Sequence, residues 1–556
     1  SSAPPVCRYP RSGDMQVGIR TDDTALNQVG TLDLAGAAAV TVDVATIRVG
    51  VNNSGTGGGT GDTHGIWNFS DTTNTITADS MLVADSVNAG NTAVTSLIVF
   101  GAGANNLNVD TVTIGGRKSE AQATINAGGI LTLNGQGGAA TTADLYVGRN
   151  NTNTGTQNDG VLDLSGGVFN AVLDNLVIGL HDQGSGSGNG SLTMDDGTVT
   201  VNSIVLADTD VAGASTNDAN TDGVLTFNRG TIALGGGDIV TAGGTAAVNF
   251  TGSTLTDVDE FATSANPLAL VQNNSSAAST LQIGADAATD TMTVQGDYSL
   301  TGGDLEIDIV DTSSFDQLIV NGMVTLGGNL VLTAGGGFTF NAGDSVTIID
   351  NNGSGDPVSG TFAGMPEGFE FQLGGAPVEI SYVGGDGNDV VISYDTTPTI
   401  DADDDTPVTG KLDNDIIVRR NGANLEVELD GTIVLNTLYT NVTLLTVNGQ
   451  TGHDILTVDS SAGNAIPINP SAPFNGIAYT GNGNTPHDGR VPPGDSLVIV
   501  GTFTTATHNI LNTSADPNDG NVDLDGNVIT YTGLEPVDMT GSTTADLIFN
   551  LPAGVT

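Results

Sequence analysis

The sequence predicts an all-β chain whose larger part is a parallel β-solenoid. Two segments carry the prediction, because residues 161–179 and 191–207 have the same pattern. Each has an alternating strand, a tight turn, a second alternating strand and a short apolar run that ends in a small residue. The turns are Gly166-Gly167 and Asp196-Gly197. Such a unit is one coil of a solenoid, since stacked copies bury an apolar row that a single coil leaves exposed.

The same unit recurs from residue 31 to residue 240. One inward position per unit, taken as equivalent, repeats every 27 to 37 residues: Leu34, Phe69, Phe100, Ala127, Leu164, Met194 and Phe227. The length variation lies in loops rich in Gly, Asn and Thr. Stacked coils would pair their strands in parallel about 4.8 Å apart, with Val, Ile, Leu and Phe in inward columns and Asn in ladders between coils. A β-sandwich is the alternative, but it would not repeat one turn position so often.

Composition limits the partners of the chain. The 556 residues contain 12 Lys and Arg against 63 Asp and Glu, so the net charge of −51 opposes binding to nucleic acid or to an anionic membrane. One cysteine, Cys7, excludes an intrachain disulfide. No apolar run reaches 18 residues, so no transmembrane segment is expected.

Four regions are predicted along the chain. Residues 1–20 hold three prolines and are expected to be an irregular N-terminal segment. The solenoid covers 21–395. An acidic linker with two prolines and four aspartates covers 396–407. A second β-rich unit, either β-helix-like or a β-sandwich, covers 408–556.

The stretch 304–392 resembles the C-terminal end of autotransporter-associated β-strand repeat proteins. The resemblance is carried by GTFAGMPEG (360–368) and YVGGDGNDVVIS (382–393). Near the end of the chain, ITYTGLEPV (529–537) and ADLIFNLPAG (545–554) are similar to β-helices of giant bacterial surface proteins. The resemblance implies a right-handed β-helix in an extracellular or cell-surface setting, and it implies no activity.

Several aspartates are candidate calcium ligands. Residues 384–392 fit the hemolysin-type nonapeptide G-G-x-G-x-D-x-U-x, in which turn carbonyls and carboxylates are hard ligands for calcium. Degenerate copies surround Asp415, Asp454 and Asp546. The alternative is that each aspartate caps a turn before a strand. The predicted metal ligands are Asp386, Asp389, Asp454, Asp546 and the cluster Asp401, Asp403, Asp404 and Asp405.

No catalytic constellation is evident, so the chain is predicted not to be an enzyme. The 12 basic residues are scattered, and five histidines are expected in loops with no two at metal-ligand spacing: His64, His181, His453, His487 and His508. A polysaccharide-degrading β-helix enzyme needs converging acids or bases and is the least favoured alternative.

These observations favour an extracellular structural protein of a bacterial surface layer, fibre or filament. It would form a homo-oligomer or polymer through solenoid ends or edges, where unpaired backbone groups are available. Calcium would stabilise it. A calcium-dependent adhesin or a carbohydrate-binding surface protein, with surface glycans as partners, is the alternative.

Overall fold

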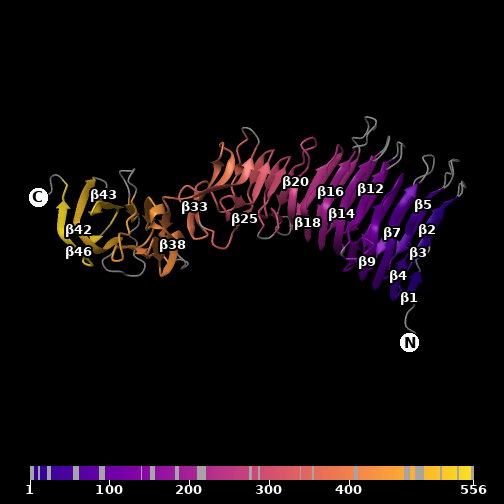
Figure 1. Cartoon of the computed structure of the whole chain (residues 1–556), viewed down its shortest axis with the longest axis horizontal. Coiled ribbons are helices and arrows are strands. Elements are labelled where there is room, and N and C mark those ends of the chain that lie inside the picture. Colours follow the sequence, from indigo (N-terminus) through magenta and orange to yellow (C-terminus); the bar gives the residue numbers. More distant parts are fainter. Residues whose placement is uncertain are drawn as a thin grey trace.

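The computed structural model describes residues 6–9, 13–21, 27–53, 62–86, 94–139, 141–150, 157–181, 187–209, 221–273, 279–285, 288–338, 340–352, 356–405, 411–468, 476–481, 494–513, 516–534 and 537–552. These residues form two consecutive units, each with a hydrophobic core of its own. The first unit is a parallel β-solenoid whose coils stack along the long axis (Figure 1). The predicted all-β solenoid is therefore confirmed.

One face of the solenoid is a 12-stranded sheet over the described residues, and its paired strands are parallel. Its strands are β3 (Gln28–Asp33), β6 (Thr63–Asn68), β8 (Val94–Phe100), β10 (Ser119–Ile125), β13 (Gln157–Leu164), β15 (Ser187–Met194), β17 (Asp222–Phe227), β19 (Thr245–Thr251), β21 (Leu270–Asn273), β24 (Tyr298–Leu300), β28 (Val324–Leu326) and β31 (Ser359–Gly360).

A second, 22-stranded sheet closes the rest of the coil. Within it, residues 74–77 of β7 pair with β4 and residues 80–86 pair with β5, so that long strands contribute to two faces. Its strands are β1 (Val6–Tyr9), β2 (Asp14–Arg20), β4 (Ala39–Asp43), β5 (Thr46–Asn52), β7 (Thr73–Ser86), β9 (Ala104–Ile114), β11 (Ile130–Asn134), β12 (Ala143–Asn150), β14 (Val168–His181), β16 (Thr198–Asp208), β18 (Thr231–Thr241), β20 (Thr254–Phe261), β22 (Thr280–Gln282), β23 (Thr291–Val294), β25 (Asp304–Asp311), β26 (Ser314–Phe315), β27 (Gln317–Val320), β29 (Asn329–Ala334), β30 (Ser345–Asn351), β32 (Phe369–Leu373), β33 (Ala376–Gly384) and β34 (Asp389–Tyr394).

The prediction that residues 1–20 are irregular is wrong for the described part of this segment, which contains two strands. Residues 6–9 form β1, which pairs with β4, and residues 14–20 form β2, which pairs with β5. Met15 and Val17 alternate with polar residues and are buried in the core, so this short stretch already has a solenoid strand pattern. Residues 1–5 and 10–12 lie outside the described part.

The stacked inward column agrees with the predicted register at every position but one. Leu164 pairs with Met194, and Met194 pairs with Phe227. The residue that pairs with Phe100 is Ile125 and not Ala127, because Asn126 and Ala127 belong to the turn that follows β10. Aromatic rings stack within the core, with centroids 4.3 Å apart for Trp67 and Phe69.

Buried asparagines link successive coils, as predicted. The Asn74 side-chain amide donates to Oδ1 of Asn105 over 2.8 Å, and Asn105 Oδ1 in turn accepts from the backbone N–H of Gly101. Each amide therefore satisfies buried backbone groups at its own turn and also the next coil.

Small residues allow the backbones of two sheets to approach closely along one corner of the solenoid, here called the glycine corner. A Cβ on Gly65 would lie 2.2 Å from the backbone nitrogen of Gly50, and a Cβ on Gly160 would lie 2.3 Å from that of Gly148. The apolar runs that end in a small residue therefore end at this corner, since no larger side chain fits between the two backbones. The pairs are Gly18–Gly30, Gly50–Gly65, Gly148–Gly160, Gly179–Gly190 and Ala207–Gly223.

Parallel stacking ends before residue 395. Strand β30 pairs with β34 in antiparallel orientation, and β34 then pairs antiparallel with β33 and β33 with β32. The region that was predicted as the last part of a parallel solenoid is thus an antiparallel meander that covers the edge of β30.

The second unit also stacks parallel strands, which alternate with antiparallel hairpins. Strands β36, β40 and β42 are parallel to one another, as are β35, β39 and β41. The elements are β35 (Thr399–Asp401), α1 (Ala402–Asp405), β36 (Asp415–Asn421), β37 (Asn424–Leu429), β38 (Thr432–Leu438), a 3₁₀ turn (Tyr439–Asn441), β39 (Leu444–Asn448), β40 (Ile455–Asp459), β41 (Gly476–Thr480), β42 (Ser496–Thr513), β43 (Asp516–Leu524), β44 (Asn527–Thr532), β45 (Val537–Asp538) and β46 (Ser542–Asn550). In the described part of the chain, no helix has the length and apolar character needed to cross a membrane.

Candidate functional site

The nonapeptide turn, residues 384–392, lies in an antiparallel hairpin. Gly384 and Asp389 face each other across the turn between β33 and β34. Asp389 is buried, and its Oδ1 accepts a hydrogen bond of 3.0 Å from the backbone N–H of Asn351. Its Oδ2 lies where a Cβ on Gly385 would be, so the carboxylate closes its own turn. Asp386 is exposed.

Asp350 lies beside this turn. Burial, together with the nearby carboxylates of Asp389 and Asp386, raises the pKa of Asp350. In a hemolysin-type roll, copies of the motif stack on parallel coils and share each ion, whereas this turn joins antiparallel strands. Asp389 therefore acts here as the residue that caps a turn before a strand.

Two of the four clustered aspartates, Asp401 and Asp404, connect the β35–α1 segment to residues 448–450. Asp401 accepts from the side-chain amide of Asn448 over 2.7 Å, and Asp404 accepts from that of Gln450 over 2.9 Å. Asp405 accepts from the backbone N–H of Asp401. Residues 399–405, which were predicted as part of a linker, thus form β35 and α1, and β35 pairs with β39. Residues 406–410 lie outside the described part.

Asp403 belongs to a different group. Its Oδ1 accepts from the Asn414 side-chain amide over 3.1 Å, and its Oδ2 accepts from the backbone N–H of Thr451, also over 3.1 Å. These contacts bring Asp403 to the corner where β36 and β40 begin. Asp454, predicted separately from the cluster, lies at the same corner.

The structure assembles an acidic ladder at this corner, made of Asp403, Asp413, Asp454 and Asp495. Asp454 Oδ1 accepts from the backbone N–H of Asn414 over 2.7 Å, and Asp495 Oδ1 accepts from that of Asp454 over 2.8 Å. Asp413 Oδ1 accepts from the backbone N–H of His453 over 2.8 Å. The carboxylates of Asp413, Asp454 and Asp495 therefore bridge three stacked coils directly before β36, β40 and β42 begin.

Burial dominates the electrostatics of the ladder. Asp454 is 1% exposed, and its pKa is raised to about 8, chiefly by desolvation. Within that net value, the hydrogen bond from Asn414 lowers the pKa, and the carboxylates of Asp495, Asp403 and Asp413 raise it. A neutral Asp454 carboxyl is thus favoured at physiological pH, because a fourth negative charge would be confined in a poorly solvated corner.

Backbone groups engage part of the oxygen atoms in the ladder. One oxygen of each of Asp413, Asp454 and Asp495 accepts a hydrogen bond from a backbone N–H group of an adjacent coil. Across the residues with described coordinates, no group of three or more His, Cys, Asp or Glu side chains is arranged to hold a metal ion. Asp546 lies apart from the ladder, exposed on β46. Calcium binding stays a prediction.

Three of the five histidines lie in strands and not in loops as predicted, whereas His453 does lie in a loop, between β39 and β40. His64 lies in β6, His181 at the end of β14 and His508 in β42, where its Nε2 lies 2.6 Å from the Tyr531 hydroxyl. His453 is buried in the acidic ladder, and His487 lies outside the described residues. Gly-rich sequences directly before His64 and after His181 obscured the ends of the strands that contain these two residues.

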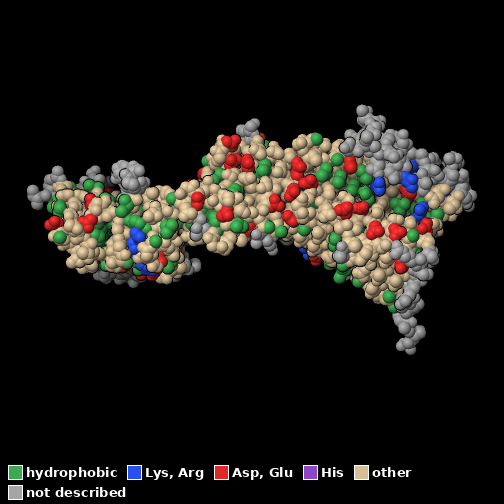
Figure 2. Space-filling view, in the orientation of Figure 1, with side chains coloured by type: hydrophobic (Ala, Val, Ile, Leu, Met, Phe, Trp, Pro, Cys, Tyr) green, Lys and Arg blue, Asp and Glu red, His purple; other side chains and the backbone are tan. Residues whose placement is uncertain are grey.

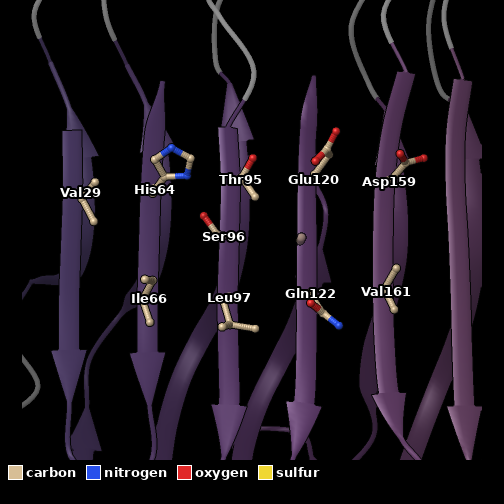
Figure 3. Close-up of a pocket in the computed structure, with 11 residues that line it drawn as sticks. Val29, His64, Ile66, Thr95, Ser96, Leu97, Glu120, Gln122, Asp159 and Val161 are labelled. Atoms are coloured by element: carbon tan, nitrogen blue, oxygen red, sulfur yellow. The ribbon is translucent and has the colours of Figure 1, made fainter. Parts of the chain in front are cut away.

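An outer groove of about 570 Å³ crosses β3, β6, β8, β10 and β13 on the outside of the 12-stranded sheet (Figure 3). Sequence analysis did not find it, because its residues come from five coils. Two rows of outward side chains line it, and within each row the residues lie on neighbouring strands. One row is His64, Thr95, Glu120 and Asp159, and the other is Ile66, Leu97, Gln122 and Val161.

The groove combines polar and aliphatic side chains. The row between the two outward rows is small, and includes Gly65, Ser96 and Ala121, because it packs against the glycine corner. Among its described lining residues, His64 is the only one with an aromatic ring. The groove therefore suits an extended ligand held by hydrogen bonds and aliphatic contacts, and it has few surfaces on which sugar rings stack.

Comparison with known proteins adds no relative. No protein-family model matches the chain, and comparisons with curated proteins and with solved structures return no match.

Proposed function

We propose that the chain is an extracellular structural protein of a bacterial surface layer, fibre or filament, and that copies associate through strand β46. The stacked parallel ladders support the first part, because the described strands of the 12-stranded sheet are hydrogen-bonded from coil to coil between β3 and β31, and a continuous ladder of this kind resists bending. A net charge of −51 on a chain with one cysteine suits a cation-rich setting outside the cell.

Strand β46 is the observation that carries the proposal. It pairs with β42 along one edge, from Ser542 to Asn550. Within the described residues, no strand pairs with its other edge. Its apolar side chains are exposed on both faces of the strand, with exposed fractions of 43% to 56% for Leu547, Ile548 and Phe549, and Leu551, directly after the strand, is 58% exposed. An open edge with apolar side chains is a template for pairing with a further strand.

A second copy of this chain is the partner that we propose for this edge. The apolar segment Leu547–Leu551 contains no charged residue, so pairing there does not bring the many carboxylates of two copies into direct contact. Repulsion between the remaining charges acts over about 8 Å at physiological ionic strength. Association should therefore strengthen as salt is added.

Sedimentation velocity tests the proposal on the full chain over a range of concentrations and salt. The double variant Leu547→Thr, Ile548→Thr keeps a residue type suited to strands and removes apolar area. Loss of two buried aliphatic groups, at about 1–1.5 kcal/mol each, should weaken association about a hundredfold.

Immunolabelling of intact, unpermeabilised producing cells tests whether the protein lies on the cell surface.

Val383→Thr is the matched control, since Val383 is 62% exposed but lies in the β33–β34 hairpin. This variant should associate like the wild type. A wild-type chain that stays monomeric at all concentrations and salt conditions would contradict the proposal, and so would a double variant that associates as strongly as the wild type.

A carbohydrate-binding surface protein is the second candidate, and the observation that favours it is the set of polar side chains in the outer groove, including Glu120, Gln122 and Asp159, which can hydrogen-bond to sugar hydroxyls although few surfaces there stack on sugar rings. Binding would place a glycan across β6, β8 and β10. Glycan-array binding should then fall with Leu97→Asp, which puts a charge among the aliphatic residues, and survive Val383→Thr. Binding that EGTA abolishes would favour the calcium-dependent adhesin, whereas an array without bound glycans would remove this candidate.

A further inference from the structure

Three arginines from distant parts of the sequence meet around one small pocket, here called the arginine pocket. Arg48, Arg117 and Arg149 line a cavity of about 230 Å³ on the outer face formed by β5, β7, β9 and β12. The basic residues were expected to be scattered, but the stacking of β5, β7, β9 and β12 brings these three to one part of the solenoid surface. Figure 2 shows Lys and Arg side chains gathered near the N-terminal end of the solenoid, on a surface where most other charged side chains are acidic.

A row of hydroxyl groups lines the same cavity. Thr46, Ser80 and Thr111 lie on the neighbouring strands β5, β7 and β9, with Thr46 paired to Ser80 and Ser80 paired to Thr111. Thr113 lies two residues further along β9, beside Leu82. Hydroxyls both donate and accept hydrogen bonds, so this row suits a polar ligand that itself carries hydroxyl groups.

Arg48 has hydrogen-bonding capacity that the described structure does not use. It lies on β5 between Gln16 of β2 and Leu82 of β7. Its Nε is buried and has no hydrogen-bond partner among the described residues. A buried guanidinium N–H group without an acceptor is unfavourable, and an oxyanion in the pocket would supply the acceptor.

The other two guanidinium groups are held in place by their own contacts. Arg117 Nε donates to Oδ1 of Asp85 over 2.8 Å, and its Nη2 contacts Oδ2 of the same carboxylate. The Arg149 guanidinium lies over the Tyr146 ring, 4.5 Å from the centroid. Three guanidinium groups against one carboxylate among the lining residues leave the pocket electropositive.

We propose that the arginine pocket binds an oxyanion, a carboxylate or sulfate group, carried by a hydroxyl-rich small molecule such as an acidic sugar. The net charge of the whole chain does not prevent this, because screening limits each charge to about 8 Å at physiological ionic strength. The cavity is several times the ~30 Å³ share of one water molecule, so it has room for a sugar ring beside the anionic group. The site is on the solenoid, far in sequence from β46, and its binding does not depend on self-association.

Isothermal titration calorimetry of the full chain tests the site with three probes: sodium galacturonate, sodium sulfate and neutral galactose. The Leu547→Thr, Ile548→Thr variant serves as a second protein background, so that a failure of self-association is distinguished from a failure of anion binding. Galacturonate should bind at one site per chain with an affinity that falls as sodium chloride is added. Galactose should not bind.

Arg48→Gln removes the charge and keeps most of the side-chain length. Its galacturonate affinity should fall about ten- to hundredfold, the effect of losing a charge-assisted hydrogen bond. Arg149→Gln should also weaken binding, whereas Arg229→Gln, outside the pocket, should not. Thermal melting of each variant checks the fold.

Sulfate that competes with galacturonate would support a general oxyanion site, and galacturonate binding without sulfate competition would support a sugar-borne carboxylate. Absence of saturable binding by both anions would overturn the proposal. Unchanged galacturonate affinity in a folded Arg48→Gln variant would also overturn it.

Discussion

Removal of the Asp454 carboxyl should make the second unit less sensitive to pH. Asp454→Asn keeps an oxygen that accepts the backbone N–H of Asn414, which is 2.7 Å from Oδ1 in the wild type. It also removes the group that titrates in the buried acidic ladder. The variant therefore isolates the charge on Asp454 from its role in bridging coils.

The direction in which stability changes with pH follows from the pKa values of the Asp454 carboxyl in the unfolded and folded chain. In the unfolded chain the pKa is near 3.8, and burial in the folded chain raises it to about 8. The folded chain holds the proton more tightly, so stability is highest at low pH and is lost as pH rises from about 4 to about 8. Within that pH range, each rise of one pH unit lowers the free energy of unfolding by at most about 1.4 kcal/mol.

Between pH 5 and pH 8, the free energy of unfolding of the wild-type second unit should therefore fall by about 2–4 kcal/mol because of Asp454. The upper figure is the limit set by the two pKa values, and relaxation of the protein and entry of water reduce it. Asp454→Asn should not show that loss. Hydrogen–deuterium exchange of peptides from β36 and β40 measures it, because local protection reports the unit that contains the ladder. Fluorescence of Trp67, which is fully buried in the first unit, reports whether the solenoid is unaffected.

Asp546→Asn is the matched control, because Asp546 is exposed in the same unit. Its pH dependence should equal that of the wild type. Equal pH dependence in Asp454→Asn and the wild type would refute the reasoning, as would a wild-type second unit that is better protected at pH 8 than at pH 5.

Two further predictions concern turns and calcium. Gly197→Ala should destabilise the solenoid by about 3 kcal/mol or more, because Gly197 has φ +114° and a Cβ there would lie 2.0 Å from the Phe169 carbonyl oxygen. Gly128→Ala, at φ +81° with open space around the Cβ, should cost about 1 kcal/mol, and equal urea midpoints for the two variants by Trp67 fluorescence would contradict this account. EGTA tests the predicted calcium ligands: a change in Tm of less than about 1 °C is expected where backbone hydrogen bonds alone hold the ladder, in which one oxygen of each of Asp413, Asp454 and Asp495 accepts a backbone N–H group. A larger fall that calcium reverses and magnesium does not would show that the aspartates bind calcium.

The coil pattern could be predicted because it is local. Alternation with a period of two sets which side chains face inward, and glycine at a turn sets where the chain bends, so Leu164, Met194 and Phe227 were correctly aligned from sequence. Ala127 was misaligned by two residues, because the length of a glycine-rich turn has no periodicity that identifies its end. Strand β2 was missed because the three prolines at residues 4, 5 and 10 made the whole N-terminal segment look irregular.

The functional groups were not predictable in the same way. The nonapeptide at residues 384–392 has the spacing of a calcium turn, but spacing does not tell whether the strands it joins are parallel or antiparallel. Asp403 and Asp454 lie in different motifs, and only the stacking of β36 on β40 brings them together.

The sequence by itself thus determined that the chain is a stack of β-coils, since burial of an alternating apolar row depends on neighbours two residues apart. Only the tertiary structure decided which polar side chains meet. Stacked coils place residues one repeat apart in sequence on adjacent strands, and the lengths of the intervening loops decide which residues pair. Arg48, Arg117 and Arg149 converge for that reason, as do the rows of the outer groove.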